Sequence, residues 1–377
     1  MAHRRISVLH AIQNLNYGGM ERLFADIVRL LDRDRFESHV LAMQYFGRFA
    51  DGMDAYATMH LAPPMGRSSM LYPRALAGLV RQIRPDVVHT HSGVWFKVSL
   101  ASRLAGVPRI IHTEHGRQKP DPASARLIGY LASRRTDVVA AVSAPLAEQL
   151  RATVVSAGTP VVLVPNGVDT ALRAPRADTG KIRNELGIGV RRPVIGSIGR
   201  LEYIKGYDVM IEAFALLRRE WSGSEPPVLV VAGEGSERPN LEARIDALGL
   251  RTSAFILGWR DDVVDLHSSF TLFTMSSRSE GTSVSLLEAM STGLCPVVTD
   301  VGGNAAVLGP ALAHRLVPST SATALAAAWR EALNDEQARA SDAEGARRRV
   351  ESEFGLGSMV HAYEALYVGG ASGQDVL

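Results

Sequence analysis

Two glutamates eight residues apart are the side chains in this sequence best suited to chemistry. Glu280 follows a strand-like apolar run, and Glu288 falls in the first turns of an expected helix. Residues between them can supply backbone N–H groups and hydroxyls at that helix start: Gly281, Thr282, Ser283 and Val284. Such a start is typical of an anion-binding nest. We therefore expect phosphate oxygens at the nest and sugar hydroxyls on the two carboxylates.

Both glutamates also have ordinary structural interpretations. The spacing from Ser285 to Glu288 is that of a capping box, in which the glutamate bonds back to the helix start. Glu280 by itself could be a solvated loop charge. The spacing alone leaves the functional and structural interpretations open.

Two cations follow the first strand expected in the second half of the chain. Arg200 leaves the expected strand Val194–Ile198, and Lys205 stands at the start of the next expected helix. Both can then reach one sheet edge and stabilise a pyrophosphate leaving group, at roughly 1.5–3 kcal/mol for each charged hydrogen bond. The structural alternative is two surface cations that flank a turn.

Paired glycines follow the first expected strand of the chain, Ile6–Ile12. Gly18 and Gly19 run into a helix, so backbone N–H groups there can approach an anion closely. A plain tight turn is the alternative. The dinucleotide fingerprint G-x-G-x-x-G is absent, which argues against a nicotinamide or flavin enzyme.

Strand-like and helix-like segments alternate along most of the 377 residues, which is typical of βαβ units with parallel sheets. The alternation pauses at Pro165–Asp169 and a polar stretch up to Arg192, with a short helix expected at Lys181–Leu186. We therefore predict an α/β protein with two Rossmann-like domains that face each other across a cleft. The predicted domains are residues 1–168 with about 356–377, and residues 169–355.

Composition narrows the class of protein. Hydrophobic residues make up 46% and charged residues 21%, as in ordinary globular chains. Cys295 is the single cysteine, so an intrachain disulfide is excluded and a reducing cytoplasm is expected. No apolar run approaches the ~20 residues of a membrane span.

Charge is unevenly distributed between the two halves. Residues 1–170 carry a formal charge of +7 and the remainder −5. This balance would draw an anionic substrate or an anionic membrane surface toward the first half. A nucleic-acid partner is not expected, because the basic residues are dispersed.

The glutamate segment resembles the E-x7-E signature of family 4 glycosyltransferases, which are retaining enzymes with the GT-B fold. Other motifs of that family follow in its order and approximate spacing: residues 17–21 (YGGME), 112–116 (HTEHG), 142–143 (VS), 165–169 (PNGVD), 199–200 (GR), 205–206 (KG), 233–235 (GEG), 258 (G) and 302–303 (GG). The resemblance covers most of the chain and is closest to bacterial members that build exopolysaccharides or lipid-linked glycans. It implies a C-terminal helix, here within Phe354–Tyr367, that crosses back to the first domain.

The resemblance also assigns roles to residues of the nucleotide-sugar site. It implies that Glu288 holds the nucleotide ribose and that Glu280 contacts the donor hexose. Arg200 and Lys205 match the pyrophosphate-binding pair, and Gly19 matches the glycine that approaches the phosphates. No cofactor and no metal are expected, since the single D-x-D match, Asp32 to Asp34, lies in a turn away from the predicted site.

His115 matches the family's active-site histidine, which hydrogen-bonds the donor sugar near the reacting carbon. His91 is the alternative, because it also ends a strand that faces the expected cleft. His89 and His112 are interpreted as structural. A zinc site built from these four is not expected, because alternate residues of one strand cannot all converge.

One motif departs from the family pattern. The family continues Gly-Gly-x-Pro-Glu, whereas residues 302–306 read GGNAA and so lack the proline and the acid. Because Ala306 stands where the family has a glutamate that could position the donor or the loop, we expect altered activity. The remaining motifs still predict an enzyme.

The resemblance implies transfer of a hexose from a UDP-sugar or GDP-sugar to a glycan or lipid-linked hydroxyl in bacterial surface polysaccharide synthesis. An acceptor at the cytosolic membrane face would suit the positive first half. Tyr45, Phe46, Arg48 and Phe49 could form a membrane or acceptor loop, or pack in the core. Rival functions are a GT-B epimerase or hydrolase, and a non-catalytic nucleotide-sugar sensor.

Overall fold

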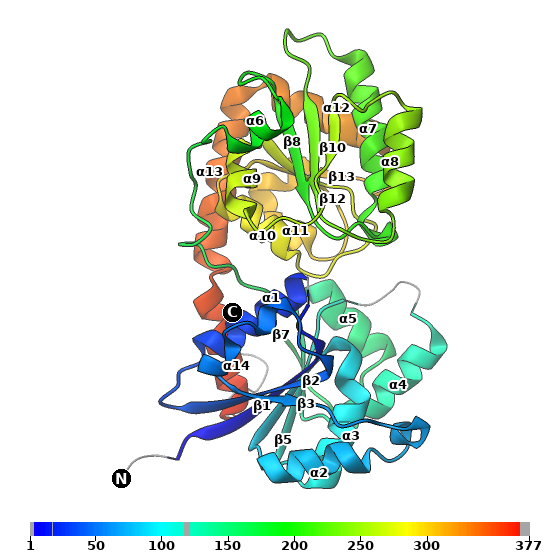
Figure 1. Cartoon of the computed structure of the whole chain (residues 1–377), viewed down its shortest axis with the longest axis vertical. Coiled ribbons are helices and arrows are strands. Elements are labelled where there is room, and N and C mark those ends of the chain that lie inside the picture. Colours follow the sequence, from blue (N-terminus) through cyan, green and yellow to red (C-terminus); the bar gives the residue numbers. More distant parts are fainter. Residues whose placement is uncertain (1–3, 17, 117–120, 370–377) are drawn as a thin grey trace. The chain divides into compact units, whose positions relative to one another are not determined.

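The computed structural model describes residues 4–16, 18–116 and 121–369, and divides the chain into two compact units (Figure 1). The first unit is Met1–Asn166 with Gly357–Leu377, and the second is Gly167–Leu356. Each unit has one parallel sheet, so the prediction of two Rossmann-like α/β domains is confirmed. Among the described helices, none is long and apolar enough to cross a membrane.

The first unit has a seven-stranded sheet in the order β3-β2-β1-β4-β5-β6-β7. Its strands are β1 (Ile6–Asn14), β2 (Phe36–Tyr45), β3 (Thr58–Leu61), β4 (Val87–His91), β5 (Arg109–Glu114), β6 (Val138–Ala141) and β7 (Val161–Leu163). Its α-helices are α1 (Gly19–Leu30), α2 (Arg74–Ile83), α3 (Trp95–Ala105), α4 (Ala123–Ser133), α5 (Ala144–Thr153) and α14 (Leu356–Tyr367).

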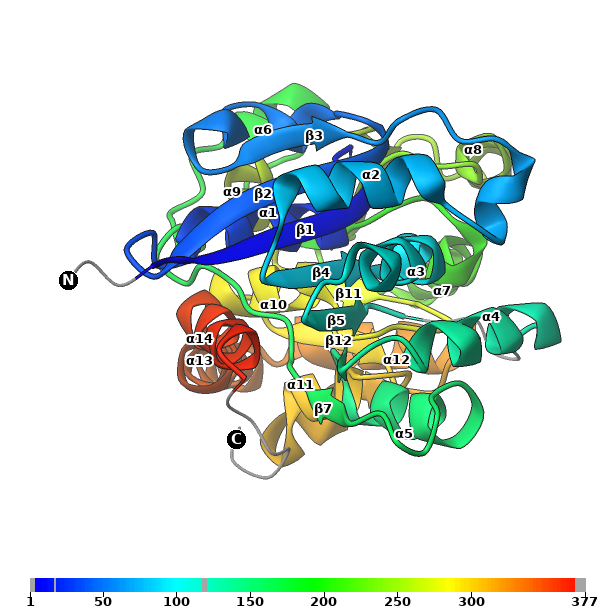
Figure 2. The ribbon, with the colours of Figure 1, turned by 90° about the horizontal axis from the view of Figure 1, so that it is seen from below.

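Helices cover both faces of this sheet, which explains why its central strands read as continuous apolar runs. Successive residues of a strand point to opposite faces of the sheet. Leu9 and Ala11 of β1 join the core formed with α2 and α3, whereas Ile12 joins the core formed with α1. Figure 2 shows the strands in sheet order, with α2 and α3 on one side and α1 and α14 on the other.

The second unit has a six-stranded parallel sheet in the order β10-β9-β8-β11-β12-β13. Its strands are β8 (Val194–Ile198), β9 (Val228–Ala232), β10 (Ala254–Ile256), β11 (Leu272–Met275), β12 (Pro296–Thr299) and β13 (Leu316–Val317). Its α-helices are α6 (Lys181–Leu186), α7 (Tyr207–Glu220), α8 (Arg238–Ala247), α9 (Val263–Ser269), α10 (Val284–Ser291), α11 (Asn304–Leu308), α12 (Ala322–Asn334) and α13 (Glu336–Glu353).

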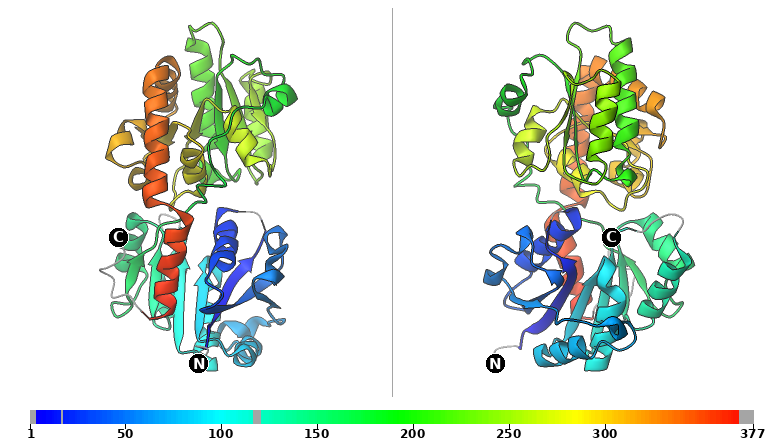
Figure 3. Two further views of the ribbon diagram at one scale, coloured as in Figure 1. Left: turned by 90° about the vertical axis from the view of Figure 1, so that its left-hand side faces the viewer. Right: turned by 45° about the vertical axis from the view of Figure 1, so that its right-hand side comes forward.

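A separate hydrophobic core packs against each face of the second sheet. One contains Phe214 of α7, Leu241 of α8 and Trp329 of α12, and the other contains Leu286 of α10 and Val350 of α13. The right-hand view of Figure 3 shows α7 and α8, in green, side by side over the first of these faces.

Two of the edge strands, β3 and β13, were not predicted from the sequence. All four residues of β3 are at least partly exposed, and β13 has only two residues, so neither has the continuous apolar pattern of a buried strand. Lys205 also differs from prediction, because it ends a single 3₁₀ turn, Tyr203–Lys205, rather than starting α7.

Candidate active site

In the second unit a small crevice lies at the carboxyl ends of β8 and β11, where residues including Ile198, Lys205 and Ser277 line it. These strands are neighbours in the sheet, yet the chain leaves β8 for α7 on one face and leaves β11 for α10 on the other. Ligands of doubly wound sheets bind at such a reversal of strand order. Arg200 and Lys205 follow β8 and Glu280 follows β11, so the fold brings these three predicted residues to one sheet edge.

Lys205 and Glu280 are in direct contact. Lys205 Nζ donates to Glu280 Oε1 at 2.6 Å, and Ser277 Oγ donates to the same oxygen at 2.6 Å. The side chain of Glu280 is only 7% exposed. The alternative of a solvated loop charge is therefore wrong. The sequence pattern did not predict this contact of Ser277, which lies three residues before Glu280.

Glycines let the loops of this crevice pack closely. Gly206 has φ +64°, and a Cβ there would collide with the carbonyl oxygen of Ser276. Gly302 has φ +57°, and a Cβ there would collide with the carbonyl oxygen of Glu280. Gly303 N also donates to Gly281 O at 2.9 Å. The glycine pair thus holds the loop of Glu280, even though the following sequence lacks the family's proline and acid.

Helix α10 begins directly after that loop and carries Glu288 on its second turn. Its N-cap is Ser283, whose Oγ accepts from Leu286 N at 3.4 Å. The alternative of a capping box between Ser285 and Glu288 is therefore wrong, because the N-cap is Ser283 and Glu288 lies too far along the helix to bond back to its start. Thr282 and Ser283 are buried at this N-terminus, and Val284 is the first helical residue.

Glu288 instead faces Arg173, a residue that the sequence analysis did not single out. Arg173 Nε and Nη2 both lie 3.0 Å from Glu288 Oε1, and both side chains are buried. Arg200, in contrast, is exposed at the end of β8. The sequence offers no periodic or motif signal for Arg173, which stands in a polar, proline-containing stretch.

In the first unit, His115 lies just beyond β5 and contacts His91 at the end of β4. His91 Nδ1 and His115 Nε2 are 3.1 Å apart. Burial lowers the pKa of His115 to about 4 and holds the pKa of His91 well below its ordinary value of 6.5. Both imidazoles are therefore neutral at pH 7, and one donates its N–H to the other.

His112 and Glu114 point to the opposite face of β5 from His115. The His112 ring stacks on Trp95 of α3 with ring centroids 3.9 Å apart. Glu114 Oε1 accepts from Ser92 Oγ at 3.2 Å and from the His115 backbone N–H at 3.2 Å. Because His112 faces α3, it cannot join His91 and His115 around one ion.

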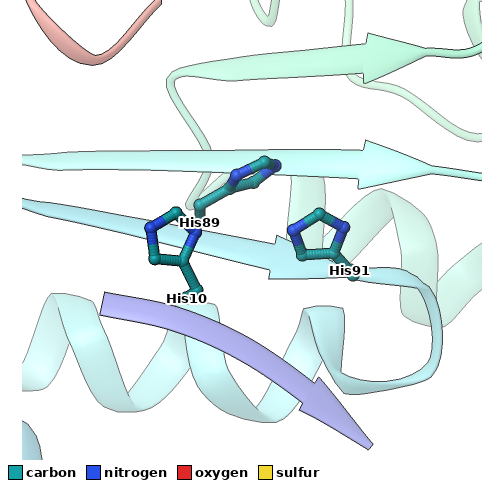
Figure 4. Close-up of side chains that lie close together, drawn as sticks. All are labelled: His10, His89 and His91. Atoms are coloured by element: carbon teal, nitrogen blue, oxygen red, sulfur yellow. The ribbon is translucent and has the colours of Figure 1, made fainter. Parts of the chain in front are cut away.

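Three histidines of the first unit, His10, His89 and His91, bring ring nitrogens close together (Figure 4). Their ring nitrogens lie within 4.8 Å of one another. Nitrogens about 2.0–2.1 Å from a tetrahedral zinc ion would be only about 3.4 Å apart. His89 already uses both ring nitrogens, on Tyr367 Oη at 2.7 Å and Thr113 Oγ1 at 2.8 Å. As placed, the three side chains do not form a preorganised zinc site.

The remaining predicted residues lie at the start of α1, at the end of β2 and in the segment that follows β2. Gly18 is the N-cap of α1 and Gly19 its first residue, and the carboxylate of Glu21 lies close over Gly18. Tyr17 of the same motif is outside the described residues. Tyr45 and Phe46 are exposed, whereas Phe49 packs against the core beneath α1, so the predicted aromatic loop is divided between surface and core.

Comparison with known proteins agrees with this architecture. Residues 17–172 match the family described as Glycosyltransferase Family 4, and residues 178–349 match Glycosyl transferases group 1. The chain is 25% identical over 319 residues to the Escherichia coli UDP-Gal:alpha-D-GlcNAc-diphosphoundecaprenol alpha-1,3-galactosyltransferase, which covers 80% of this chain and 81% of that protein.

Two further relatives differ in what they act on or bind. The 2-deoxystreptamine N-acetyl-D-glucosaminyltransferase of Streptomyces fradiae is 28% identical over 331 residues, covering 79% of this chain and 75% of that enzyme. The crystal structure of Anabaena HepE in complex with UDP-glucose superposes with a TM-score of 0.84 at 22% identity, over 97% of this chain and 100% of that one. The chain therefore belongs to the group 1, family 4 glycosyltransferases and has the GT-B fold.

Proposed function

We propose that this enzyme transfers a hexose from a nucleoside diphosphate sugar to an acceptor hydroxyl, with retention of anomeric configuration and without a metal. The observation that carries the proposal is the contact of Glu280 with Lys205 and Ser277 at the crevice of the second sheet. A carboxylate fixed beside a cation can accept hydrogen bonds from hexose hydroxyls while the cation contacts the diphosphate.

The leaving group is stabilised by charge that is already in place. Lys205 and Arg200 bind the diphosphate oxygens, together with the backbone N–H groups of Gly281 and Thr282 before α10. Preorganised donors of this kind lower the barrier where negative charge develops. Glu288 holds the ribose, and Gly18 and Gly19 offer further N–H groups from the first unit. The two cations and the helix N-termini stabilise the negative charge of the leaving diphosphate, which a divalent ion stabilises in metal-dependent transferases.

The chemical step requires no nucleophile from the enzyme. The bond between the anomeric carbon and the diphosphate oxygen breaks through an oxocarbenium-like state. The acceptor oxygen bonds to the same face of the sugar, and its proton passes to the departing phosphate oxygen. His115, neutral at pH 7, hydrogen-bonds the sugar near the reacting carbon. Segment 165–169 is the hinge for closure of the two domains, which excludes water.

The names of the relatives support a choice of sugar donor and of acceptor. The E. coli relative uses UDP-Gal and a diphosphoundecaprenol acceptor, and HepE was crystallised with UDP-glucose. We assign a UDP-sugar as donor, with a GDP-sugar as the alternative. The acceptor is a glycan or lipid-linked sugar of bacterial surface or exopolysaccharide synthesis, and it binds the first domain.

A lipid-linked acceptor would place the enzyme at the cytosolic membrane face. Helix α4 of the first unit carries exposed Leu127, Ile128 and Tyr130 beside the exposed Arg126. Apolar side chains next to a cation suit the interface of an anionic membrane. The excess positive charge of residues 1–170 supports the same peripheral contact.

The test is nucleoside diphosphate release from UDP-glucose, UDP-N-acetylglucosamine and GDP-mannose, each with EDTA present, by the parent and by Glu288→Ala. We expect slow release from one donor and its loss in the variant. Donor binding without release, across a broad acceptor panel, would instead favour a non-catalytic sensor, for which Ala306 is the motivating residue. Release that needs an added divalent metal would refute metal independence.

A further inference from the structure

Arg173 and Glu288 form a buried ion pair beside the proposed nucleotide site. Arg173 is 6% exposed and Glu288 is 7% exposed. An ionised carboxylate at such a depth is costly unless a cation and hydrogen bonds compensate it. The guanidinium provides both, because Nε and Nη2 converge on Glu288 Oε1 at 3.0 Å.

The backbone of Arg173 is itself fixed to α10 and α13. Its N–H donates to Asp169 O at 2.9 Å, and its carbonyl accepts from Ser291 Oγ at 3.0 Å and from Arg347 Nη1 at 3.0 Å. Ser291 lies three residues after Glu288, so both residues stand on one face of α10. The backbone contacts on this face aim the guanidinium at Glu288.

We propose that Arg173 is the positioning residue for ribose recognition, an inference that rests on the proposed role of Glu288. Arg173 fixes the rotamer of Glu288, so that Glu288 accepts hydrogen bonds from the vicinal ribose hydroxyls. The guanidinium presents two N–H groups in a rigid fork, which a lysine ammonium does not reproduce. Arg173 acts through Glu288, and its loss weakens ribose recognition more than diphosphate binding.

The experiment measures the affinity of UDP and of 2′-deoxy-UDP by isothermal titration calorimetry on the full chain. The variants are Arg173→Met and Arg173→Lys. The matched control is Arg315→Met, which removes another buried arginine of the second unit, paired with Asp342 through Nε at 2.6 Å. Donor KM and kcat are measured for the same variants.

Arg173→Met is expected to weaken UDP binding roughly tenfold to a hundredfold, the range for a lost hydrogen bond to a charged group. The preference for UDP over 2′-deoxy-UDP falls with it. Donor KM rises more than kcat falls. Arg173→Lys has a smaller effect in the same direction. Arg315→Met lowers the melting temperature but leaves both affinities within about twofold of the parent.

Parent-like UDP affinity and parent-like ribose preference in Arg173→Met would overturn the proposal. Should that variant fail to fold, Arg173→Lys decides the question by the same two readouts. Equal weakening of UDP and 2′-deoxy-UDP would also overturn it, because that result indicates a general structural role. A parent that binds none of UDP, GDP and ADP would refute the proposed function itself.

Discussion

At the scale of single residues, the contact between Lys205 and Glu280 makes each side chain depend on the other. Lys205→Met should lower kcat/KM for the donor about tenfold to a hundredfold, because a charged hydrogen bond to the diphosphate is lost and Glu280 loses its partner. The measurement is steady-state release of nucleoside diphosphate.

A double-mutant cycle separates this coupling from a general effect of charge. The double variant Lys205→Met with Glu280→Gln should lose less than the product of the two single effects, as expected for residues in contact. Lys181→Met is the control, since Lys181 is an exposed lysine of α6 in the same unit paired with Asp262 and Asp265. If the fall in kcat/KM of the double variant equals the product of the falls in the two single variants, the two residues are not coupled.

His10 makes the stability of the first unit depend on pH. Burial lowers its pKa to about 3, below the 6.5 expected in the unfolded chain. Between these values only the unfolded chain binds the proton, so stability falls as the pH drops from about 6.5 toward 3, by up to about 1.4 kcal/mol per pH unit.

Replacement of His10 by leucine removes this contribution. Neither ring nitrogen has a hydrogen-bond partner among the described residues, so His10→Leu should keep or raise the melting temperature at pH 7.5. Between pH 7.5 and 5 it should lose less stability than the parent. His361→Leu, at an exposed position of α14, is the control. An unchanged pH dependence in His10→Leu would count against the buried neutral imidazole.

At the scale of secondary-structure elements, the turn before α11 positions the loop between β11 and α10. Gly302→Ala should shift that loop, because the new Cβ collides with the carbonyl oxygen of Glu280 at a left-handed φ of +57°. We expect a loss of about 1–3 kcal/mol in stability and a fall in donor kcat/KM.

Gly345→Ala is the matched control for that substitution. Gly345 lies inside α13, and a Cβ there has no neighbour within 4 Å, so alanine should be neutral or stabilise by about 0.5–1 kcal/mol. Unchanged kinetics in Gly302→Ala would show that the turn does not hold the loop.

Most elements could be predicted from the sequence because buried parallel strands are continuous apolar runs. Strand β8 has the predicted bounds, Val194–Ile198. The exposed edge strand β3 lacks that pattern and was missed. Local spacing suggested a capping box for Glu288, but the partner of this carboxylate is Arg173, which is distant in sequence. Such pairings depend on the packing of the second unit, which no local pattern encodes.

At the scale of the whole molecule, the charge difference between the halves predicts association with anionic membranes. The full chain should cosediment with vesicles that contain phosphatidylglycerol but not with pure phosphatidylcholine, and 0.5 M NaCl should reverse the binding. Leu127→Glu on α4 should weaken this association. Gln149→Glu on α5 adds the same charge elsewhere in the first unit and is the control. Equal binding to both kinds of vesicle would contradict an electrostatic contact.

The central claim is that the enzyme transfers a hexose with retention and without a metal. The most direct measurement is proton NMR of the sugar first released when the enzyme hydrolyses its α-linked sugar nucleotide in the presence of EDTA. The account predicts that the α anomer appears first and equilibrates later with the β anomer. Initial release of the β anomer, or release only after a divalent metal is added, would contradict it.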